Sequence, residues 1–190
     1  KNSYFKSLKI SLIVCLMSIK DIITVPNEIL KKTSTPIEKV SKNEIKLAKD
    51  LFETMYNSKG IGLAAVQVGI LKRILVVDVS TEEEQNKPIC FINPVIKSLS
   101  SQTSIYEEGC LSIPDTFIEI ERPKTCTVEY IDIKGELKNL KCDGLLSTCI
   151  QHEINHLDGK LIIDNLSKLK RDIIIKKISK NKNNPDRIIV

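Results

Sequence analysis

The two histidines of this chain, His152 and His156, stand four residues apart in the stretch Q-H-E-I-N-H, with Glu153 beside the first. On a helix, side chains four residues apart project from one face, so both imidazoles can bind a single metal ion. Histidine is sufficiently neutral near pH 7 to act as a ligand. Glu153 lies one residue further round the helix, where its carboxylate can reach a metal-bound water without being a ligand. The pattern predicts hydrolysis by a metal-activated water.

A catalytic metal site of this type needs three protein ligands and one open position. Two solvated surface histidines are the simpler interpretation, but the preceding apolar segment L-L-S-T-C-I favours a buried helix. Buried imidazoles and a carboxylate without partners are costly to desolvate, and a metal would satisfy them. Three residues are candidates for the third ligand: a cysteine upstream, Cys110, and two carboxylates downstream, Asp158 and Asp164.

A zincin-like endopeptidase would share the H-E-x-x-H pattern and would need a third histidine or a glutamate as its last ligand. The chain has no third histidine, and no glutamate follows Glu153. The sequence therefore excludes this class of protease.

Three helices are expected, one of which carries the two histidines. Asp143 can cap a helix from about Leu145 to Leu157, which Gly159 would end. Before it, Ser41 and Glu44 form a capping box, and apolar residues recur at helical spacing over residues 42–57. A last helix is expected from about Leu166 to Lys180.

Short segments rich in β-branched residues separate the first two helices. After the run K-R-I-L-V-V-D-V, strands are expected near residues 89–92, 95–99, 104–111, 117–121, 125–133 and 136–142, with a hairpin turn at Lys134-Gly135. The order predicts an α+β fold, not an alternating β-α-β fold. Antiparallel β-sheets would pack around a central metal-binding helix, with an N-terminal helix and a C-terminal helix.

The composition predicts one globular domain. The chain has 190 residues, 42% of them hydrophobic, and a mean hydropathy near zero. Its six cysteines include no C-x-x-C pair, so we expect reduced thiols and no zinc ribbon. We expect residues 1–16 to be a leader or an added segment upstream of a natural start at Met17, and residues 17–190 to be the catalytic domain with its basic tail.

Three segments occur in order along the chain: G-I-G-L-A-A-V-Q at 60–67, E-G-C-L-S at 108–112 and Q-H-E-I-N-H at 151–156. Together they resemble the peptide deformylase family, over a length from about Ile22 to the end of the last helix. The resemblance implies removal of the N-formyl group from the formylmethionine of newly made polypeptides, with release of formate. It implies that Cys110, His152 and His156 hold one divalent metal. Fe(II) is expected, with zinc, nickel or cobalt as substitutes.

The resemblance also implies roles around that metal. Glu153 would act as general base and then pass its proton to the leaving amine. The side-chain amide of Gln67 and the backbone N–H of Leu111 would stabilise the oxyanion.

The peptide would lie along the glycine-rich segment as an added strand, held by Gly60, Ile61 and Gly62. Its methionine side chain needs an apolar pocket, for which the candidates are Ile61, Leu145, Thr148, Cys149 and the face of His152. A phosphate-binding loop is the weaker alternative for the two glycines, because no strand or Walker lysine accompanies them.

Three positions depart from the common pattern of the family. Val66 stands where proline is usual, and it keeps the apolar character. Asn155 stands where aspartate is usual, and we expect it near Arg122, with the loss of a charge-assisted contact. Phe117 and its neighbours lack the basic residue with which some members contact the peptide.

The net charge of +5 is concentrated in the tail, where Lys168, Lys170, Arg171, Lys176, Lys177, Lys180, Lys182 and Arg187 accompany only two aspartates. A solvated helix face is one interpretation, and docking on the ribosome is the other. The alternative to an enzyme is a non-catalytic metal-holding protein that docks through this tail. We expect a monomer in the bacterial cytoplasm without DNA or membrane binding, or an organellar protein if residues 1–16 are a targeting segment.

Overall fold

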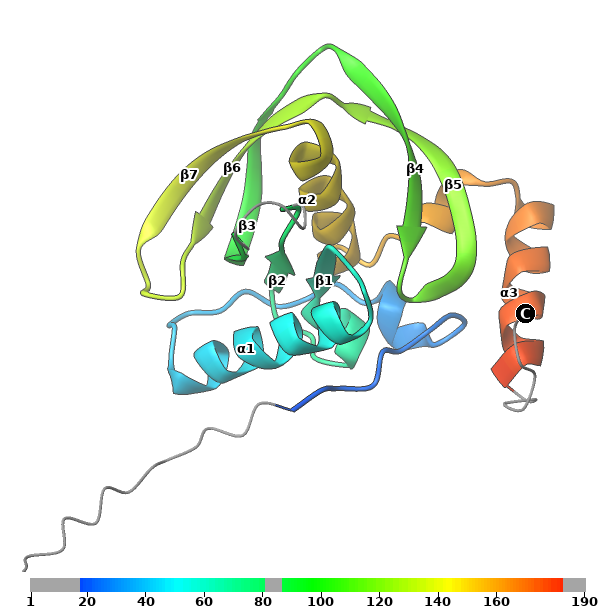
Figure 1. Cartoon of the computed structure of the whole chain (residues 1–190), viewed down its shortest axis with the longest axis horizontal. Helices are drawn as coiled ribbons and strands as arrows, with labels where there is room; N and C mark the ends of the chain where they lie inside the picture. Colours follow the sequence, from blue (N-terminus) through cyan, green and yellow to red (C-terminus); the bar gives the residue numbers. More distant parts are fainter. Residues whose placement is uncertain (1–17, 81–86, 183–190) are drawn as a thin grey trace, which may run out of the picture.

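The computed structural model describes residues 18–80 and 87–182 (Figure 1). The expected leader, residues 1–16, lies outside this part of the chain. None of the helices in the described ranges has the length and apolar character needed to cross a bilayer.

Two antiparallel sheets form most of the fold. The larger has five strands in the order β1-β2-β3-β6-β7, and the smaller pairs β4 with β5. Their bounds are β1 (Gly62–Ala64), β2 (Ile74–Val77), β3 (Ile89–Leu99), β4 (Thr103–Cys110), β5 (Ile113–Pro123), β6 (Thr125–Ile131) and β7 (Leu137–Asp143). The long strands bend over the molecule, and one helix runs between the two sheets (Figure 1). The predicted α+β class is confirmed.

Three α-helices accompany the sheets: α1 (Lys42–Asn57), α2 (Gly144–Leu157) and α3 (Lys168–Lys182). The capping box of Ser41 and Glu44 begins α1 as predicted, and the Asp143 side chain caps α2. Three single 3-10 turns, η1 (Glu28–Lys31), η2 (Ala65–Val68) and η3 (Ile162–Asn165), connect the larger elements. The last helix starts two residues later than predicted, because Leu166 ends η3 in an extended conformation.

The two strands predicted near residues 89–92 and 95–99 are one continuous strand, β3. Its pairing with β6 shifts between Ile92 and Val95, where Asn93 has a positive φ of 51° and Pro94 follows. Proline cannot donate to a ladder, so the strand passes this point through an irregularity and does not end. The Asn93 side chain fixes the irregularity by bonding the backbone of Ile37.

The four residues of β2 explain how α2 is placed. Leu75 and Val77 pack in the cluster around α2, whereas Ile74 and Val76 pack in the cluster around α1. The alternation of a strand sends successive side chains to opposite faces, so β2 lies between two helices and is apolar throughout. Helix α2 is therefore held inside the molecule, with sheet on both sides.

A third apolar cluster joins the smaller sheet to the C-terminal helix. Ile113 and Ile120 of β5 pack with Leu161, Ile162, Ile163 and Ile178. Helix α3 consequently lies against the outer side of β5, away from α2 (Figure 1).

Candidate metal centre

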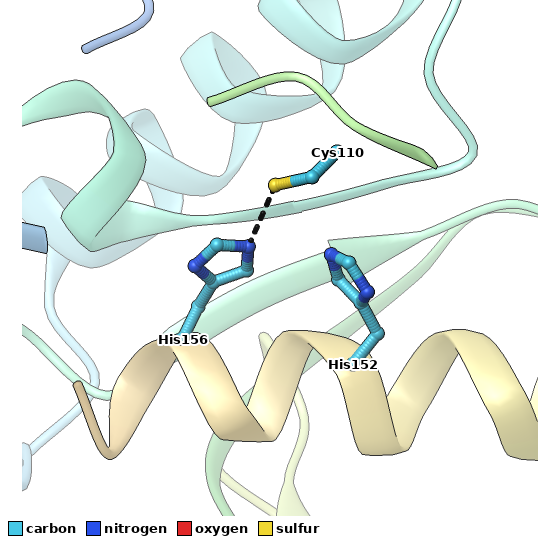
Figure 2. A group of neighbouring side chains, drawn as sticks. All are labelled: Cys110, His152 and His156. Atoms are coloured by element: carbon cyan, nitrogen blue, oxygen red, sulfur yellow. Dashed lines mark hydrogen bonds between the residues drawn. The ribbon is translucent and has the colours of Figure 1, made fainter. Parts of the chain in front are cut away.

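Three potential ligand atoms converge where the end of β4 meets α2 (Figure 2). His152 and His156 project from one face of α2, and their ring centroids are 5.0 Å apart. Cys110 approaches from the last position of β4, and its Sγ lies 3.2 Å from Nε2 of His156. Potential ligand atoms of the three residues all lie within 4.8 Å of one another.

The structure distinguishes between the three candidates for the third ligand. Cys110 lies at the histidines, whereas the two downstream aspartates have other partners. Asp158 accepts a hydrogen bond from Arg73 at 2.7 Å, and Asp164 pairs with Lys31 at 2.5 Å.

The donor set fits a divalent metal. One sulfur and two imidazole nitrogens bind zinc and similar ions at about 2.0–2.3 Å, which the spacing of these atoms allows. Burial lowers the pKa of His156 well below its ordinary value, which favours the neutral imidazole that a metal requires. Cys110 and His152 both line the cavity, so a metal that they held with His156 would be accessible from it.

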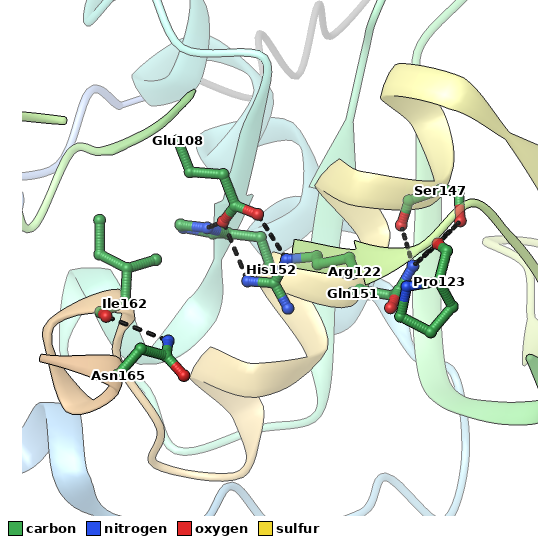
Figure 3. A network of polar contacts seen from close by, with 8 residues as sticks. All are labelled: Glu108, Arg122, Pro123, Ser147, Gln151, His152, Ile162 and Asn165. Atoms are coloured by element: carbon green, nitrogen blue, oxygen red, sulfur yellow. Dashed lines mark hydrogen bonds and ion pairs between the residues drawn. The ribbon is translucent and has the colours of Figure 1, made fainter. Parts of the chain in front are cut away.

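A second layer of polar contacts orients His152 (Figure 3). Its Nδ1 lies 2.8 Å from Oε2 of Glu108, so Nδ1–H donates to the carboxylate and Nε2 remains for a metal. Arg122 in turn donates to both oxygens of Glu108, at 2.5 and 2.9 Å. Burial alone lowers the pKa of His152, but the hydrogen bonds with Cys110 and Glu108 outweigh it and raise the pKa to about 10. A metal would therefore compete with a proton at this ring.

Sequence reasoning included Glu108 in a motif but gave it no role. The period of two along β4 was the available signal, because it places Glu108 and Cys110 on the same face of the strand. The expected contact between Arg122 and Asn155 is wrong: the guanidinium is paired with Glu108, and Asn155 makes no side-chain hydrogen bond within the described ranges.

Glu153 faces the cavity from the buried side of α2. The residue is only 4% exposed, and its Oε2 has no hydrogen-bond partner within residues 18–80 and 87–182. Burial raises its pKa to about 7. The carboxylate is thus buried without a counter-ion of its own and is able to exchange a proton near neutral pH.

The glycine-rich segment crosses directly over Glu153. A Cβ on Gly62 would lie 2.5 Å from Oε1 of Glu153 and 2.7 Å from Sγ of Cys149. Such contacts are closer than atoms tolerate, so a side chain at this position would displace the carboxylate or the strand. Glycine is required here to let β1 approach α2.

Gln67 is held with its amide nitrogen directed toward Cys110. The residue is 1% exposed, and its Oε1 accepts a hydrogen bond from the backbone N–H of Ala64 at 2.8 Å. Its Nε2 lies 3.2 Å from Oγ of Ser112 and 3.8 Å from Sγ of Cys110. Because the oxygen is already occupied, the amide presents a donor to the metal centre.

A cavity of about 500 Å³ opens beside these groups. The structure brings every residue predicted for the site into its wall except His156, which is buried and does not line the cavity. The wall includes Gly60, Ile61, Gly62, Gln67, Cys110, Leu111, Leu145, Thr148, Cys149, His152 and Glu153. Burial raises the pKa of Cys149 well above its ordinary value, so the thiol stays neutral and adds to the apolar lining.

Comparison with known families agrees with this geometry. The family model described as Polypeptide deformylase matches residues 19–172. A protein of Pelagibacter ubique named Peptide deformylase is 56% identical over 174 residues, which cover 92% of this chain and 100% of that protein. One of the same name from Rhizobium meliloti is 51% identical, over 86% of this chain and 94% of that protein.

Solved structures show the same architecture. Peptide deformylase from Ehrlichia chaffeensis in complex with actinonin aligns with a TM-score of 0.85 at 44% identity, over 88% of this chain and 100% of that one. A Met-Ala-Ser-bound class I type b peptide deformylase from Acinetobacter baumannii aligns with a TM-score of 0.75 at 30% identity, over 80% and 100% of the two chains.

Proposed function

The chain belongs to the polypeptide deformylase family, and from this premise we propose that Cys110, His152 and His156 hold the metal of its reaction. The protein is a metal-dependent hydrolase that removes the N-formyl group from newly made polypeptides and releases formate. The assignment of the metal ligands rests on one observation: a sulfur and two imidazoles converge beside a cavity. Nothing supports the alternative of a non-catalytic metal-holding protein.

Glu153 is the proton carrier in this proposal. A divalent metal held by Cys110, His152 and His156 would supply Lewis-acid chemistry to water and to the formyl carbonyl. The carboxylate of Glu153 accepts a proton from the attacking water and delivers it to the leaving amine nitrogen. A pKa raised to about 7 suits both steps, since the group is then neither a very weak base nor a very weak acid near neutral pH.

Two donors stabilise the charge that develops on the formyl oxygen. The Nε2–H of Gln67 is preset by the bond between its Oε1 and Ala64, so no reorganisation is needed during the reaction. The backbone N–H of Leu111 is the second donor, in the turn between β4 and β5 directly after Cys110.

The peptide binds as an additional strand along Gly60–Gly62. Strand β1 is the outer strand of the five-stranded sheet, so one of its edges has no partner in that sheet. A peptide can use the free backbone groups of that edge, as in other cases of strand addition. The methionine side chain then enters the part of the cavity lined by Ile61, Leu145, Thr148 and Cys149. The Met-Ala-Ser complex of the relative from Acinetobacter baumannii supports a peptide ligand of this kind.

Fe(II) is the native metal in this proposal, with zinc, nickel or cobalt as functional substitutes. The test is hydrolysis of formyl-Met-Ala-Ser and its acetyl analogue by protein loaded anaerobically with each metal. We expect rapid release of formate, little cleavage of the acetyl peptide, and the highest kcat/KM with Fe(II). No formate release with one metal bound per chain would contradict the proposed assignment of the site.

The basic helix α3 docks the enzyme on the ribosome, as a monomer in the bacterial cytoplasm. Its cationic side chains Lys168, Lys170, Arg171, Lys176, Lys177 and Lys180 can approach an anionic surface. Deleting the helix is a poor test, because Ile178 is buried in the cluster with β5. Replacing Lys176, Lys177 and Lys180 by glutamine keeps that packing. We expect weaker cosedimentation with ribosomes, and unchanged binding would contradict the docking proposal.

A further inference from the structure

An exposed aromatic side chain stands on the rim of the cavity. Phe117 of β5 is 67% exposed although it is large and apolar. Its ring lies over Gly109 of the paired strand, where an added Cβ would come within 2.9 Å of the ring. Phe117 is therefore backed by the sheet, and its free face is turned to solvent at the mouth of the cavity.

A second, shallower depression begins on the other side of the same residue. We call it the α3 groove; it has a volume of about 330 Å³ and lies between β5 and α3. Its lining is Thr116, Phe117, Ile118, Leu166, Lys170, Ile173 and Ile174. Ile118, Leu166 and Ile174 pack against the buried cluster beneath, so they form a fixed floor. Lys170 is the one charged residue of this lining within the described ranges.

Two features mark the α3 groove as a continuation of the active-site cavity. Thr116 and Phe117 line both, so a chain that leaves the cavity over this rim enters the groove directly. The wall of the groove on α3 includes Ile173, which is 59% exposed although it is apolar. Neighbouring exposed apolar side chains on a soluble surface mark a binding site more often than isolated ones do.

We propose that the α3 groove binds apolar side chains of the nascent polypeptide downstream of its formylmethionine. This inference rests on the proposed function, because it extends the binding of the same substrate. An extended peptide advances by about 3.3 Å per residue, so the residues that follow the first three can cross the rim at Phe117. A polypeptide that is still unfolded exposes the leucine and isoleucine side chains that this lining suits. The groove thus favours substrates with apolar residues shortly after the first few positions.

The test compares peptides that differ only downstream. Formyl-Met-Ala-Ser is the reference, and a series of hexapeptides carries one leucine at position four, five or six on a serine background. For each protein variant, the quantity measured is kcat/KM of the hexapeptide divided by kcat/KM of the tripeptide. Partial burial of one leucine side chain predicts a gain of roughly fivefold to tenfold at one position over the all-serine hexapeptide.

Ile173→Ser and Leu169→Ser provide matched variants on the same helix. Leu169 is more exposed than Ile173, at 72%, and does not line the groove. We expect Ile173→Ser to abolish the gain from leucine and Leu169→Ser to retain it. Circular dichroism and thermal unfolding of both variants check that the helix is intact.

The possible results distinguish a failure of the groove proposal from a failure of the proposed function. Turnover of the tripeptide without a gain from leucine at any position overturns the groove alone. An equal loss in the two variants also overturns it, since the effect would then come from α3 in general. A dimer seen by sedimentation that Ile173→Ser dissociates would show that a second copy covers the groove, and would overturn the proposal. Failure to turn over the tripeptide overturns the proposed function, and the groove with it.

Discussion

Helices α2 and α3 carry polar residues in opposite ways. In α2, His152, Glu153 and His156 are buried, and a sheet lies on both sides of the helix. In α3, the lysines from Lys168 to Lys180 are exposed, and Ile178 packs in the apolar cluster with β5. Burying ionisable groups is costly, so the desolvation of these side chains in α2 must be offset by hydrogen bonds or by a bound metal. Exposed charges cost little and each contributes little.

Substitutions should therefore have larger effects in α2 than on the exposed face of α3. Changing one atom of a buried ionisable side chain on α2 removes a group whose surroundings are fixed, whereas changing several exposed lysines of α3 alters only solvated charges.

Glu153→Gln should give the largest effect. It keeps the shape of the side chain but removes the proposed proton carrier, so kcat should fall by roughly 10²–10⁴. Steady-state hydrolysis of formyl-Met-Ala-Ser measures the loss. Metal content, determined by elemental analysis, should be unchanged because Glu153 is not among the converging ligand atoms. A variant that lost its metal would show that Glu153 acts as a ligand.

Glu108→Gln should weaken metal binding by roughly 10–100-fold. A neutral amide is a weaker acceptor than the carboxylate for the Nδ1–H of His152, and it leaves the charge of Arg122 without its counter-ion. Competition with a chromogenic chelator gives the affinity. Glu119→Gln is the matched control, because Glu119 is an exposed glutamate on the paired strand. Equal affinity in the two variants would remove Glu108 from the metal centre.

Glu44 tests an intermediate case, a buried carboxylate at the start of α1. Hydrogen bonds from Lys72 and Ser41 lower its pKa from 4.5 to about 2. A lowered pKa in the folded state stabilises the protein above pH 4.5, and this contribution disappears as the pH falls from about 4.5 to about 2. Glu44→Gln should therefore cost about 1 kcal/mol at pH 7, because Lys72 is partly solvated, and nearly nothing at pH 2. Urea unfolding at both pH values measures it; a pH-independent difference would contradict the assignment.

Replacing Lys176, Lys177 and Lys180 together by glutamine should have the smallest effect on the enzyme itself. Solvated charges contribute little to folding, so the free energy of unfolding should change by less than about 0.5 kcal/mol. Thermal unfolding and tripeptide hydrolysis are the measurements. A decrease of several kcal/mol in the free energy of unfolding would show that the exposed charges of α3 contribute substantially to folding, which would contradict this prediction.

The sequence predicted those features that depend on local patterns. The capping box at Ser41 and the histidine spacing specify α1 and α2, because helical periodicity is encoded in neighbouring residues. The resemblance to a family pointed to Cys110, which spacing alone left open beside Asp158 and Asp164. The ion pair between Glu108 and Arg122 joins two strands through tertiary pairing, which no local pattern encodes. The expected contact of Arg122 with Asn155 came from the family's usual aspartate at that position, and it is wrong.

The continuity of β3 through Pro94 was missed for a related reason. Proline indicates a break when only the local sequence is known, whereas the structure tolerates it because the neighbouring Asn93 bonds the distant backbone of Ile37. The α3 groove was likewise invisible, since its two walls are separated by about fifty residues of sequence.

The three metal ligands are tested most directly by X-ray absorption spectroscopy on metal-loaded protein, with Cys110→Ser as the matched variant. We expect one sulfur and two imidazole nitrogens in the first coordination shell of the unaltered protein, and loss of the sulfur signal in the variant. A shell of oxygen and nitrogen only in the unaltered protein would contradict the central claim that Cys110, His152 and His156 hold the metal.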